Sequence, residues 1–175
     1  LFVSDGLKEL GNVFLEEFPK AQYQACWVHL GRAMCRHARN KDWKEVLGEA
    51  KKIYGSTSKE EAEKQLSSFI EKYEGKYPKA VNVIRDNPSL FSFYDYPAEI
   101  QRSLYTSNPI ESFNKKYKKN IRKKEQFPNE DSLDRFTCAI ASDYNKQFES
   151  RQMKGFSKCS YELQQLFEER YGSKG

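Results

Sequence analysis

The stretch LFVSDGLKELGNVFLEEFPKAQYQACWVHL (residues 1–30) holds the two segments of the chain that have strand-like composition. Residues 1–3 form a short apolar run before Ser4-Asp5-Gly6, a pattern that predicts a buried strand ending in a turn. Residues 21–30 are enriched in Tyr, Cys, Trp and Val, which favours a second strand. Because two short strands do not form a stable sheet alone, either the first strand is wrongly predicted or partner strands precede Leu1 in a longer protein.

The rest of the sequence has apolar residues at the spacing of amphipathic helices. The expected helices span about residues 7–18, 29–39, 41–54, 58–73, 78–84, 97–104 and 110–124. A long helix with an apolar stripe from Leu133 to Phe148 follows, and a final helix carries Leu163, Leu166 and Phe167. The tetrad Ser58-Lys59-Glu60-Glu61 has the pattern of a capping box, which predicts a helix start at this position. The sequence therefore predicts an α+β fold that is predominantly helical.

The positive charge of the chain is concentrated in one block. The sequence has 30 Lys+Arg and 25 Asp+Glu, a formal net charge of +5. Residues 1–100 are balanced, so the excess lies beyond them, where KKYKKNIRKK (115–124) contains no acid. Such a block indicates either a nucleic-acid-binding patch or a solvated helix face. No stretch approaches the roughly 18 consecutive apolar residues of a membrane-spanning helix, which argues against a membrane protein.

Two acidic residues stand at positions where a carboxylate can be presented to a ligand. Asp5 follows the first predicted strand, and the carboxyl ends of strands are where ligands and metals bind in open sheets. An Asp-Gly turn or a helix N-cap is the alternative interpretation. Glu111 lies in the first turn of the helix that carries the basic block. Its alternative role is the N3 residue of a capping box in which Asn108 is the N-cap.

The pair Cys26-x-x-His29 has the spacing of two metal ligands. A zinc site needs two further ligands, and Cys35 and His37 are close in sequence, but Cys35 falls on a different helix face from the histidines. A packed cysteine and a hydrogen-bonded histidine are therefore favoured over zinc. Two further candidates are Trp27 and Trp43, which either stack on an exposed nucleobase or, as we expect, are buried in the core.

These segments together resemble the transposases of the Mutator type, in their bacterial insertion-sequence branch. The family pattern has a strand ending in Ser-Asp-Gly, a C-x-x-H at a strand-to-helix passage, a helical insertion and a Tyr-Thr-(Thr/Ser)-Asn-x-(Ile/Val)-Glu-Ser motif. The chain has these elements in the same order, as Ser4-Asp5-Gly6, Cys26 with His29, and YTSNPIES (105–112). The aromatic FYDYP (93–97) before the last motif also fits the pattern.

The resemblance implies a partial RNase H-like core, with two short strands, interrupted by an all-helical insertion. Residues 1–40 would be the late part of this core, 41–96 the insertion, 97–150 the return to the core with the catalytic glutamate helix, and 151–175 a C-terminal helix. Asp5 would be the second and Glu111 the third acid of an Asp-Asp-Glu site. The first Asp would lie on an upstream strand that this chain lacks, so we expect the fragment alone to be inactive.

The chemistry of such a site needs divalent metal. Two Mg²⁺ or Mn²⁺ ions can activate the attacking group and stabilise the leaving oxygen at a DNA phosphodiester, and carboxylates are suitable hard ligands. The resemblance places Cys26, His29, Asn108 and Ser112 close to this site. The expected DNA-binding residues are Arg32, Arg36, Asn114, Lys115, Lys116, Lys118, Lys119, Arg122 and Lys123. Of these, Lys115, Lys119 and Arg122 share the helix face of Glu111 and are favoured.

The resemblance predicts a DNA transposase fragment that performs metal-dependent phosphodiester hydrolysis and strand transfer at transposon ends. Its partners would be double-stranded DNA and further copies of the full-length protein, in the cytoplasm at the nucleoid and without a membrane. A domesticated or decayed fragment that binds DNA without cutting it is the first alternative. A helical interaction protein with a merely solvated basic helix is the second alternative, and it predicts no steep dependence of DNA affinity on salt.

Overall fold

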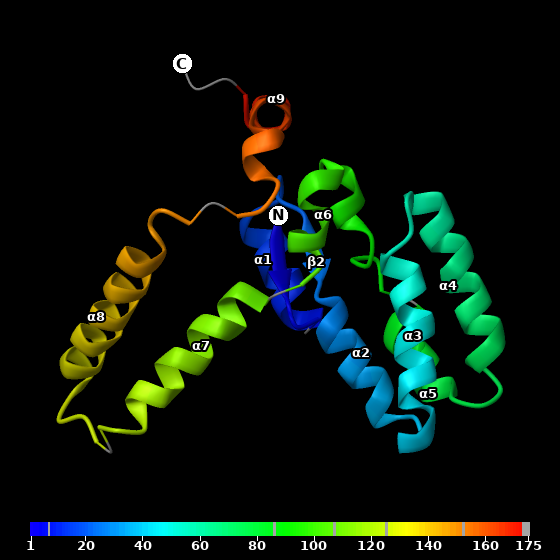
Figure 1. The fold of residues 1–175 in the computed structure, drawn as a ribbon, viewed down its shortest axis with the longest axis horizontal. Coiled ribbons are helices and arrows are strands. Elements are labelled where there is room, and N and C mark those ends of the chain that lie inside the picture. The colour runs from blue at the N-terminus through cyan, green and yellow to red at the C-terminus, as the bar shows by residue number, and fades with distance from the viewer. Residues whose placement is uncertain (7, 86, 107, 125, 152, 173–175) are drawn as a thin grey trace. The chain divides into compact units, whose positions relative to one another are not determined.

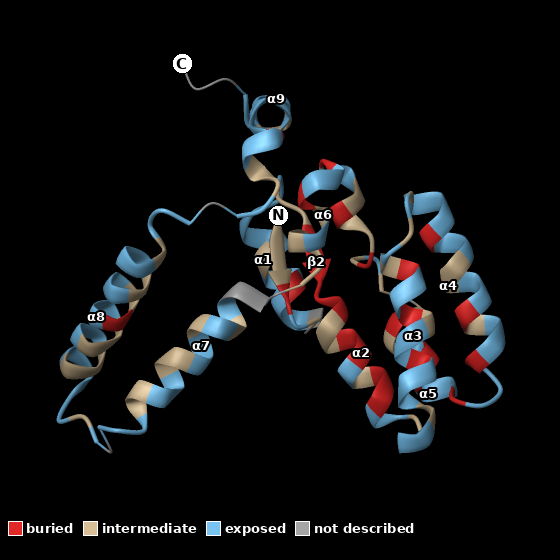
Figure 2. Cartoon of the chain, in the orientation of Figure 1, coloured by how far each residue is buried: buried red, intermediate tan, exposed pale blue. Residues whose placement is uncertain are grey.

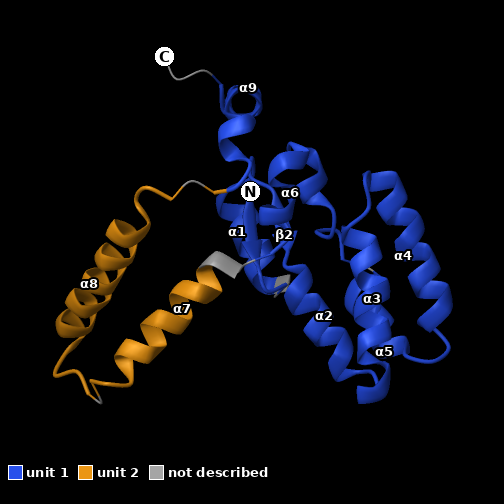
Figure 3. Ribbon diagram, viewed as in Figure 1, with its two compact units in different colours: residues 1–107, 154–175 blue, residues 108–153 orange. Residues whose placement is uncertain are grey.

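The computed structural model describes residues 1–6, 8–85, 87–106, 108–124, 126–151 and 153–172, with the side chains of residues 8, 108 and 109 left out. The chain divides into two compact units (Figure 3). Unit 1 consists of residues 1–107 and 154–175, and unit 2 consists of residues 108–153. The fold is mostly helical with one pair of short strands in the described residues, which confirms the predicted fold at this level.

The N-terminal part of unit 1 is a strand–helix–strand segment (Figure 1). The strands β1 (Phe2–Ser4) and β2 (Tyr23–Ala25) pair in parallel, with Ser4 opposite Ala25, and α1 (Lys8–Glu17) connects them. Gly6 has a φ of 90°, a conformation that favours glycine, where the chain turns from β1 towards α1. Parallel pairing places the carboxyl ends of both strands at one edge of the sheet.

Helices make up the remainder of unit 1. They are α2 (Trp27–Arg36), α3 (Trp43–Tyr54), α4 (Lys59–Tyr73), α5 (Pro78–Arg85), α6 (Ala98–Leu104) and α9 (Ser160–Tyr171), with 3₁₀ turns at Asn40–Asp42, Ser92–Asp95 and Phe156–Lys158. A continuous apolar core joins β2 to α2–α5, and Figure 2 shows its buried residues on the facing sides of these helices. Trp27, Phe93 and Met34 are among its largest fully buried side chains. Because the core includes residues from 25 to 93, it fixes the start of α2 relative to the helices that follow.

A buried amide holds the segment before α6 against β2. Gln24 is fully buried, and its Nε2 donates to the carbonyl oxygen of Leu90 at 3.0 Å. Its Oε1 accepts from the backbone N–H of Phe93 at 3.1 Å. The indole Nε1 of Trp27 donates to the same Leu90 oxygen at 3.0 Å. These bonds satisfy polar groups that would otherwise be buried without partners, and they set the position of the chain that leads into α6.

The predicted start of α4 is confirmed, with a small difference. Ser58 is the N-cap, and its Oγ accepts from the N–H of Glu61 at 3.2 Å. The carboxylate of Glu61 accepts from the N–H and hydroxyl of Thr57, each at 2.8 Å, rather than from the N–H of Ser58. The glutamate therefore reaches one residue further back than in a standard capping box.

The C-terminal helix α9 is hydrogen-bonded to the residues just before β2 and α6. Arg170 Nη1 donates to Gln22 Oε1 at 3.0 Å and to the hydroxyl of Tyr96 at 3.2 Å. Gly155, just before α9, has a φ of 93°, and a Cβ at this position would lie 2.2 Å from the carbonyl oxygen of Glu99. The backbone of this segment therefore approaches α6 as closely as only glycine permits.

Unit 2 contains a pair of helices, α7 (Asn108–Ile121) and α8 (Glu130–Phe148), that are joined by contacts between aromatic rings and by side-chain hydrogen bonds. Phe113 of α7 meets Tyr144 of α8 edge to face, with ring centroids 5.2 Å apart. The hydroxyls of Tyr117 and Thr137 lie 2.8 Å apart. Lys116 Nζ lies 5.3 Å from the ring centre of Tyr144. The apolar side of α7 thus faces α8, which leaves its other side to solvent.

Three expectations from the sequence need correction. Helix α2 begins at Trp27 rather than His29, because Cys26 already has extended backbone and acts as the N-cap. Helix α7 ends at Ile121, and the basic residues 122–124 form a turn in which two N–H groups bond three residues back. Trp43 is 41% exposed rather than buried. Among the described helices, none is long and apolar enough to cross a membrane.

Candidate functional site

The parallel strand pair brings two of the candidate residues to one sheet edge. The N–H of Cys26 donates to the carbonyl oxygen of Ser4 at 2.7 Å, so the residues that follow both strands leave the sheet side by side. Asp5 comes directly after Ser4, and its side chain is exposed. Ser4 itself is buried, and its hydroxyl is hydrogen-bonded to that of Tyr23. A carboxylate is therefore held at the carboxyl edge of the sheet, on a backbone that the buried Ser4 anchors.

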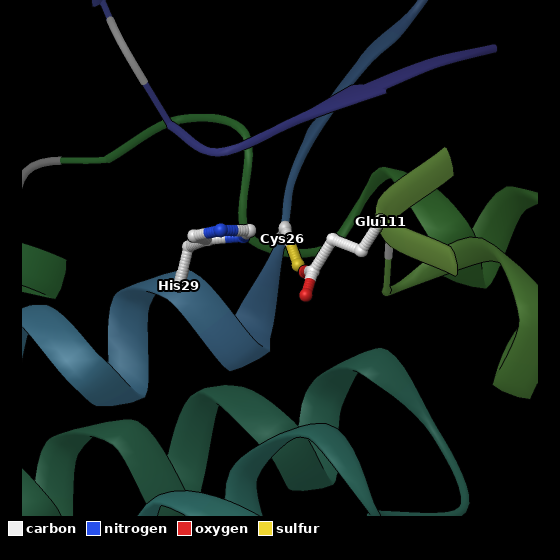
Figure 4. Close-up of side chains that lie close together, drawn as sticks. All are labelled: Cys26, His29 and Glu111. Carbon is white, nitrogen blue, oxygen red and sulfur yellow. The ribbon is translucent and has the colours of Figure 1, made fainter. Parts of the chain in front are cut away.

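The start of α2 lies at the same edge. Figure 4 shows Cys26 where the strand passes into α2 and His29 one turn further along this helix. Cys26 is fully buried, and His29 is half-buried. Arg32 Nη1 lies 3.5 Å from His29 Nε2, one turn further again. The C-x-x-H spacing therefore places a thiol, an imidazole and a guanidinium in succession on one side of the first turns of α2.

The YTSNPIES motif starts at this same place in unit 1. The N–H of Trp27, in the first turn of α2, donates to the carbonyl oxygen of Tyr105 at 3.0 Å. The ring of Tyr105 packs against Phe93 and Tyr54, with centroids 5.2 Å and 5.1 Å away. Tyr105 thus anchors the start of the motif beside Cys26. This anchoring role of Tyr105 is not predictable from the sequence, because nothing in the neighbouring residues indicates that a backbone hydrogen bond is made there.

The other acidic candidate belongs to unit 2. Glu111 lies in the first turn of α7, as Figure 4 also shows, and its side chain is half-buried. The positive end of a helix dipole favours a negative charge at such a position. Ser112 is exposed on the next position. Asn108, predicted as the N-cap, is the first residue of α7, but its side chain lies outside the described residues.

The predicted DNA-binding residues fall on α2, on α7 and on the turn that follows α7. Arg32 and Arg36 are both exposed on α2 in unit 1. In unit 2 the exposed candidates are Asn114, Lys115, Lys118, Lys119, Arg122 and Lys123. Lys116 differs, because its Nζ donates to Gln147 Oε1 at 3.0 Å and lies over the ring of Tyr144. Lys116 therefore contacts α8 within unit 2, whereas the exposed lysines of α7 give the solvent-facing side of this helix a positive charge.

Cys35 and His37, which were considered as additional zinc ligands, lie further along α2 than Cys26 and His29. Cys35 is buried on α2, and burial raises the pKa of its thiol, which opposes the thiolate that zinc requires. His37 is exposed at the C-cap of the same helix. Within the described part of the chain, neither residue joins a group of three ligand side chains.

The family model described as "Transposase, Mutator family" matches residues 1–151, which is most of the chain. The chain therefore belongs to the Mutator family of transposases.

Individual relatives are described as transposases for insertion sequence elements. The chain is 34% identical over 168 residues to the transposase for insertion sequence element IS905 of Lactococcus lactis, covering 96% of this chain and 43% of that protein. It is 35% identical over 145 residues to the transposase for IS1201 of Lactobacillus helveticus, covering 82% of this chain and 39% of the relative. The chain thus spans about two fifths of the length of these curated relatives.

Proposed function

We propose that this chain carries two of the three acidic residues of a metal-dependent DNA transposase. Asp5 and Glu111 act together on a DNA phosphodiester at transposon ends, within an RNase H-like core that the helices of residues 41–96 interrupt. The remaining carboxylate comes from outside these 175 residues. The observation that carries the proposal is the sheet edge at which Asp5, Cys26 and the start of the YTSNPIES motif meet, joined by the Ser4–Cys26 and Tyr105–Trp27 backbone bonds.

The covalent chain supports the joint action of the two acids. Glu111 follows Tyr105 by six residues, and a fully extended segment of that length spans at most about 20 Å. Because the carbonyl of Tyr105 is bonded to the start of α2, Glu111 stays within reach of the sheet edge that presents Asp5.

The donor set fits a hard divalent cation. The exposed carboxylate of Asp5 and the half-buried carboxylate of Glu111 provide oxygen ligands of the kind that Mg²⁺ and Mn²⁺ prefer. When bound, such ions polarise the phosphodiester and lower the pKa of a bound water. The sulfur of Cys26 and the imidazole of His29 suit softer metals, so we assign these two residues to positioning rather than to magnesium binding.

The exposed basic residues give the DNA-binding part of the proposal. The solvent side of α7 presents lysines with no acid in residues 115–124, and Arg32 and Arg36 extend the positive charge along α2. Lysine and arginine contacts to phosphates supply affinity and hold a duplex in place without selecting its sequence. The chain therefore contributes chemistry and affinity, and the full protein assembles in several copies to hold two DNA ends.

Binding without cleavage is the second candidate. The observation that favours it is that the basic residues of α7 sit in unit 2 with their own aromatic contacts to α8, so their DNA binding does not depend on a complete acidic site. Under this alternative the same DNA affinity persists and metal has no effect on the DNA.

The test compares Mg²⁺-dependent DNA cleavage by the full gene product with that of its Glu111→Gln variant. We expect a loss of at least about 100-fold, because a bound metal supplies several kcal/mol of transition-state stabilisation. Glu99→Gln on α6 is the matched control and should keep its activity. Full activity of Glu111→Gln would show that this glutamate is not part of the reacting centre.

A further inference from the structure

A groove runs between α2 and α3 in unit 1, with a volume of about 690 Å³. Its walls are mostly apolar, and exposed side chains of Trp43 and Leu47 form one side of it. The indole Nε1 of Trp43 donates to the carbonyl oxygen of Ala38 at 3.1 Å, which fixes the ring in place. Gly48 leaves further room, since a Cβ there would meet nothing within 4 Å. An exposed tryptophan is thus held in a fixed orientation at the side of an open groove.

The charged residues of the groove all have one sign. Arg32 and Arg36 reach it from α2 and Lys51 from α3, and its described lining contains no acidic residue. A groove with apolar walls and a cationic margin complements a ligand that has a flat apolar part and anionic groups beside it. A nucleotide with an unpaired base has this chemistry, because the base offers a stacking face and each phosphate a negative charge.

The position of the groove in unit 1 adds a second argument. One end is lined by Trp27 and Val28, the two residues between Cys26 and His29, and therefore starts where β2 passes into α2. Asp5 leaves the sheet beside Cys26 at this same edge. A DNA strand that leaves the proposed reacting centre along α2 would pass directly into the groove.

We infer that the α2–α3 groove binds an unpaired nucleotide of the DNA strand, stacking its base on Trp43 and holding its phosphates with Arg32, Arg36 and Lys51. This inference rests on the proposed function and names the form of DNA that the site engages. It assigns base stacking to the insertion helix α3, whereas the basic side of α7 contacts duplex phosphates.

The test measures binding of the 175-residue chain to two labelled DNAs, a blunt duplex and the same duplex with a single-stranded overhang, by fluorescence anisotropy. We expect the wild type to prefer the overhang. Trp43→Ala should weaken overhang binding by about 5- to 100-fold, the effect of losing one base–aromatic stack, and should leave blunt-duplex binding within about 2-fold. Trp43→Phe should bind the overhang with most of the wild-type affinity, because phenylalanine also offers an aromatic face.

A second variant tests the groove without removing a contact. Gly48→Leu adds a side chain where there is space and replaces a helical glycine by a residue of higher helix propensity, so α3 should remain folded. It should nevertheless weaken overhang binding as Trp43→Ala does, because leucine occupies the groove. Intrinsic fluorescence gives a direct readout: both tryptophans of the sequence line the groove, so the part of the quenching by the overhang that is lost in Trp43→Phe reports on Trp43.

The outcomes separate the two hypotheses. If wild type and variants bind both DNAs alike, the groove does not hold a nucleotide, although the proposed transposase function stands. If the chain binds neither DNA, the proposed function fails and this inference fails with it. If an acidic amphipathic peptide binds in a Trp43-dependent manner while the overhang does not, the groove is a protein-docking site and the inference is wrong.

Discussion

The backbone N–H of Trp27 donates a 3.0 Å hydrogen bond to the carbonyl oxygen of Tyr105, which joins the start of α2 to the start of the YTSNPIES motif. The whole of α3, α4 and α5 lies between these two residues in the sequence. The segment that contains those helices therefore leaves the sheet edge at Trp27 and returns to it at Tyr105. This geometry explains how a large helical segment can be accommodated without moving the elements that carry Asp5 and Cys26.

The buried amide of Gln24 should be important for stability. Gln24→Leu leaves the N–H of Phe93 without its acceptor in the core, while Leu90 still accepts from Trp27. We expect a loss of about 2 kcal/mol in the free energy of unfolding, measured by urea denaturation, because an unsatisfied buried donor costs about 1–3 kcal/mol. Gln165→Leu on the exposed side of α9 is the control and should change stability by about 0.5 kcal/mol or less. Equal effects of the two changes would contradict the role of Gln24.

The close approach of Gly155 to α6 predicts a steric effect. Gly155→Ala places a Cβ 2.2 Å from the Glu99 carbonyl oxygen on a backbone with φ of 93°. Gly172 has a similar φ of 82° with nothing within 4 Å, so Gly172→Ala isolates the cost of the backbone conformation alone. That cost is about 1–2 kcal/mol. Thermal unfolding should show a clearly larger loss of stability for Gly155→Ala than for Gly172→Ala. Equal losses would mean that α6 can move away from the added Cβ without a loss of stability.

Asp42 makes the stability of the helical segment depend on pH. The hydrogen bond from Tyr77 and then that from Lys76 lower the pKa of the Asp42 carboxyl below its ordinary value of 3.8. A carboxyl whose pKa is lowered on folding stabilises the folded state above its unfolded pKa, and this contribution disappears as pH falls through the folded pKa.

The difference in urea midpoint between wild type and Asp42→Asn should therefore be constant above about pH 5 and should shrink below about pH 4. Tyr77→Phe removes the hydroxyl donor and should reproduce part of the effect in the same pH range. A difference that does not change between pH 6 and pH 3 would show that the carboxyl is not stabilised by these donors.

The basic side of α7 predicts a specific salt dependence. Replacing Lys115, Lys119 and Arg122 by Gln should weaken duplex binding and reduce the slope of log affinity against log salt by about 2 to 3, since each phosphate contact contributes about 0.9. The control replaces the exposed Lys59, Lys64 and Lys79 of α4 and α5, which removes the same net charge elsewhere. An equal change of slope in both triple variants would indicate that net charge alone drives binding.

The sequence was sufficient to predict the helices, the two strands and the capped start of α4, because these depend on local periodicity and on residues three or four apart. It did not predict how β1 and β2 pair, since pairing depends on a contact across α1. Trp43 was misjudged for a related reason: its size favours burial, but the side of α3 on which it lies is decided by the packing of α2.

For the candidate site, residue type and motif order indicated Asp5, Glu111, Cys26 and His29 as chemistry-bearing residues. The backbone bonds that arrange the site, from Cys26 to Ser4 and from Trp27 to Tyr105, leave no sequence signal, because any residue can supply a carbonyl. The groove along α2 was not predicted either. The sequence shows a glycine at position 48, but only the structure shows the open space beside it.

The central proposal is that Asp5 and Glu111 belong to one metal-dependent site, and a double-mutant cycle of Mn²⁺ binding tests it most directly. Binding to the wild type, Asp5→Asn, Glu111→Gln and the double variant is measured by electron paramagnetic resonance. If the two carboxylates belong to one site, each single change weakens Mn²⁺ binding by about 10-fold or more. The loss of binding free energy in the double variant is then much smaller than the sum of the losses in the two single variants. Additive effects, or binding that neither change alters, would contradict the claim.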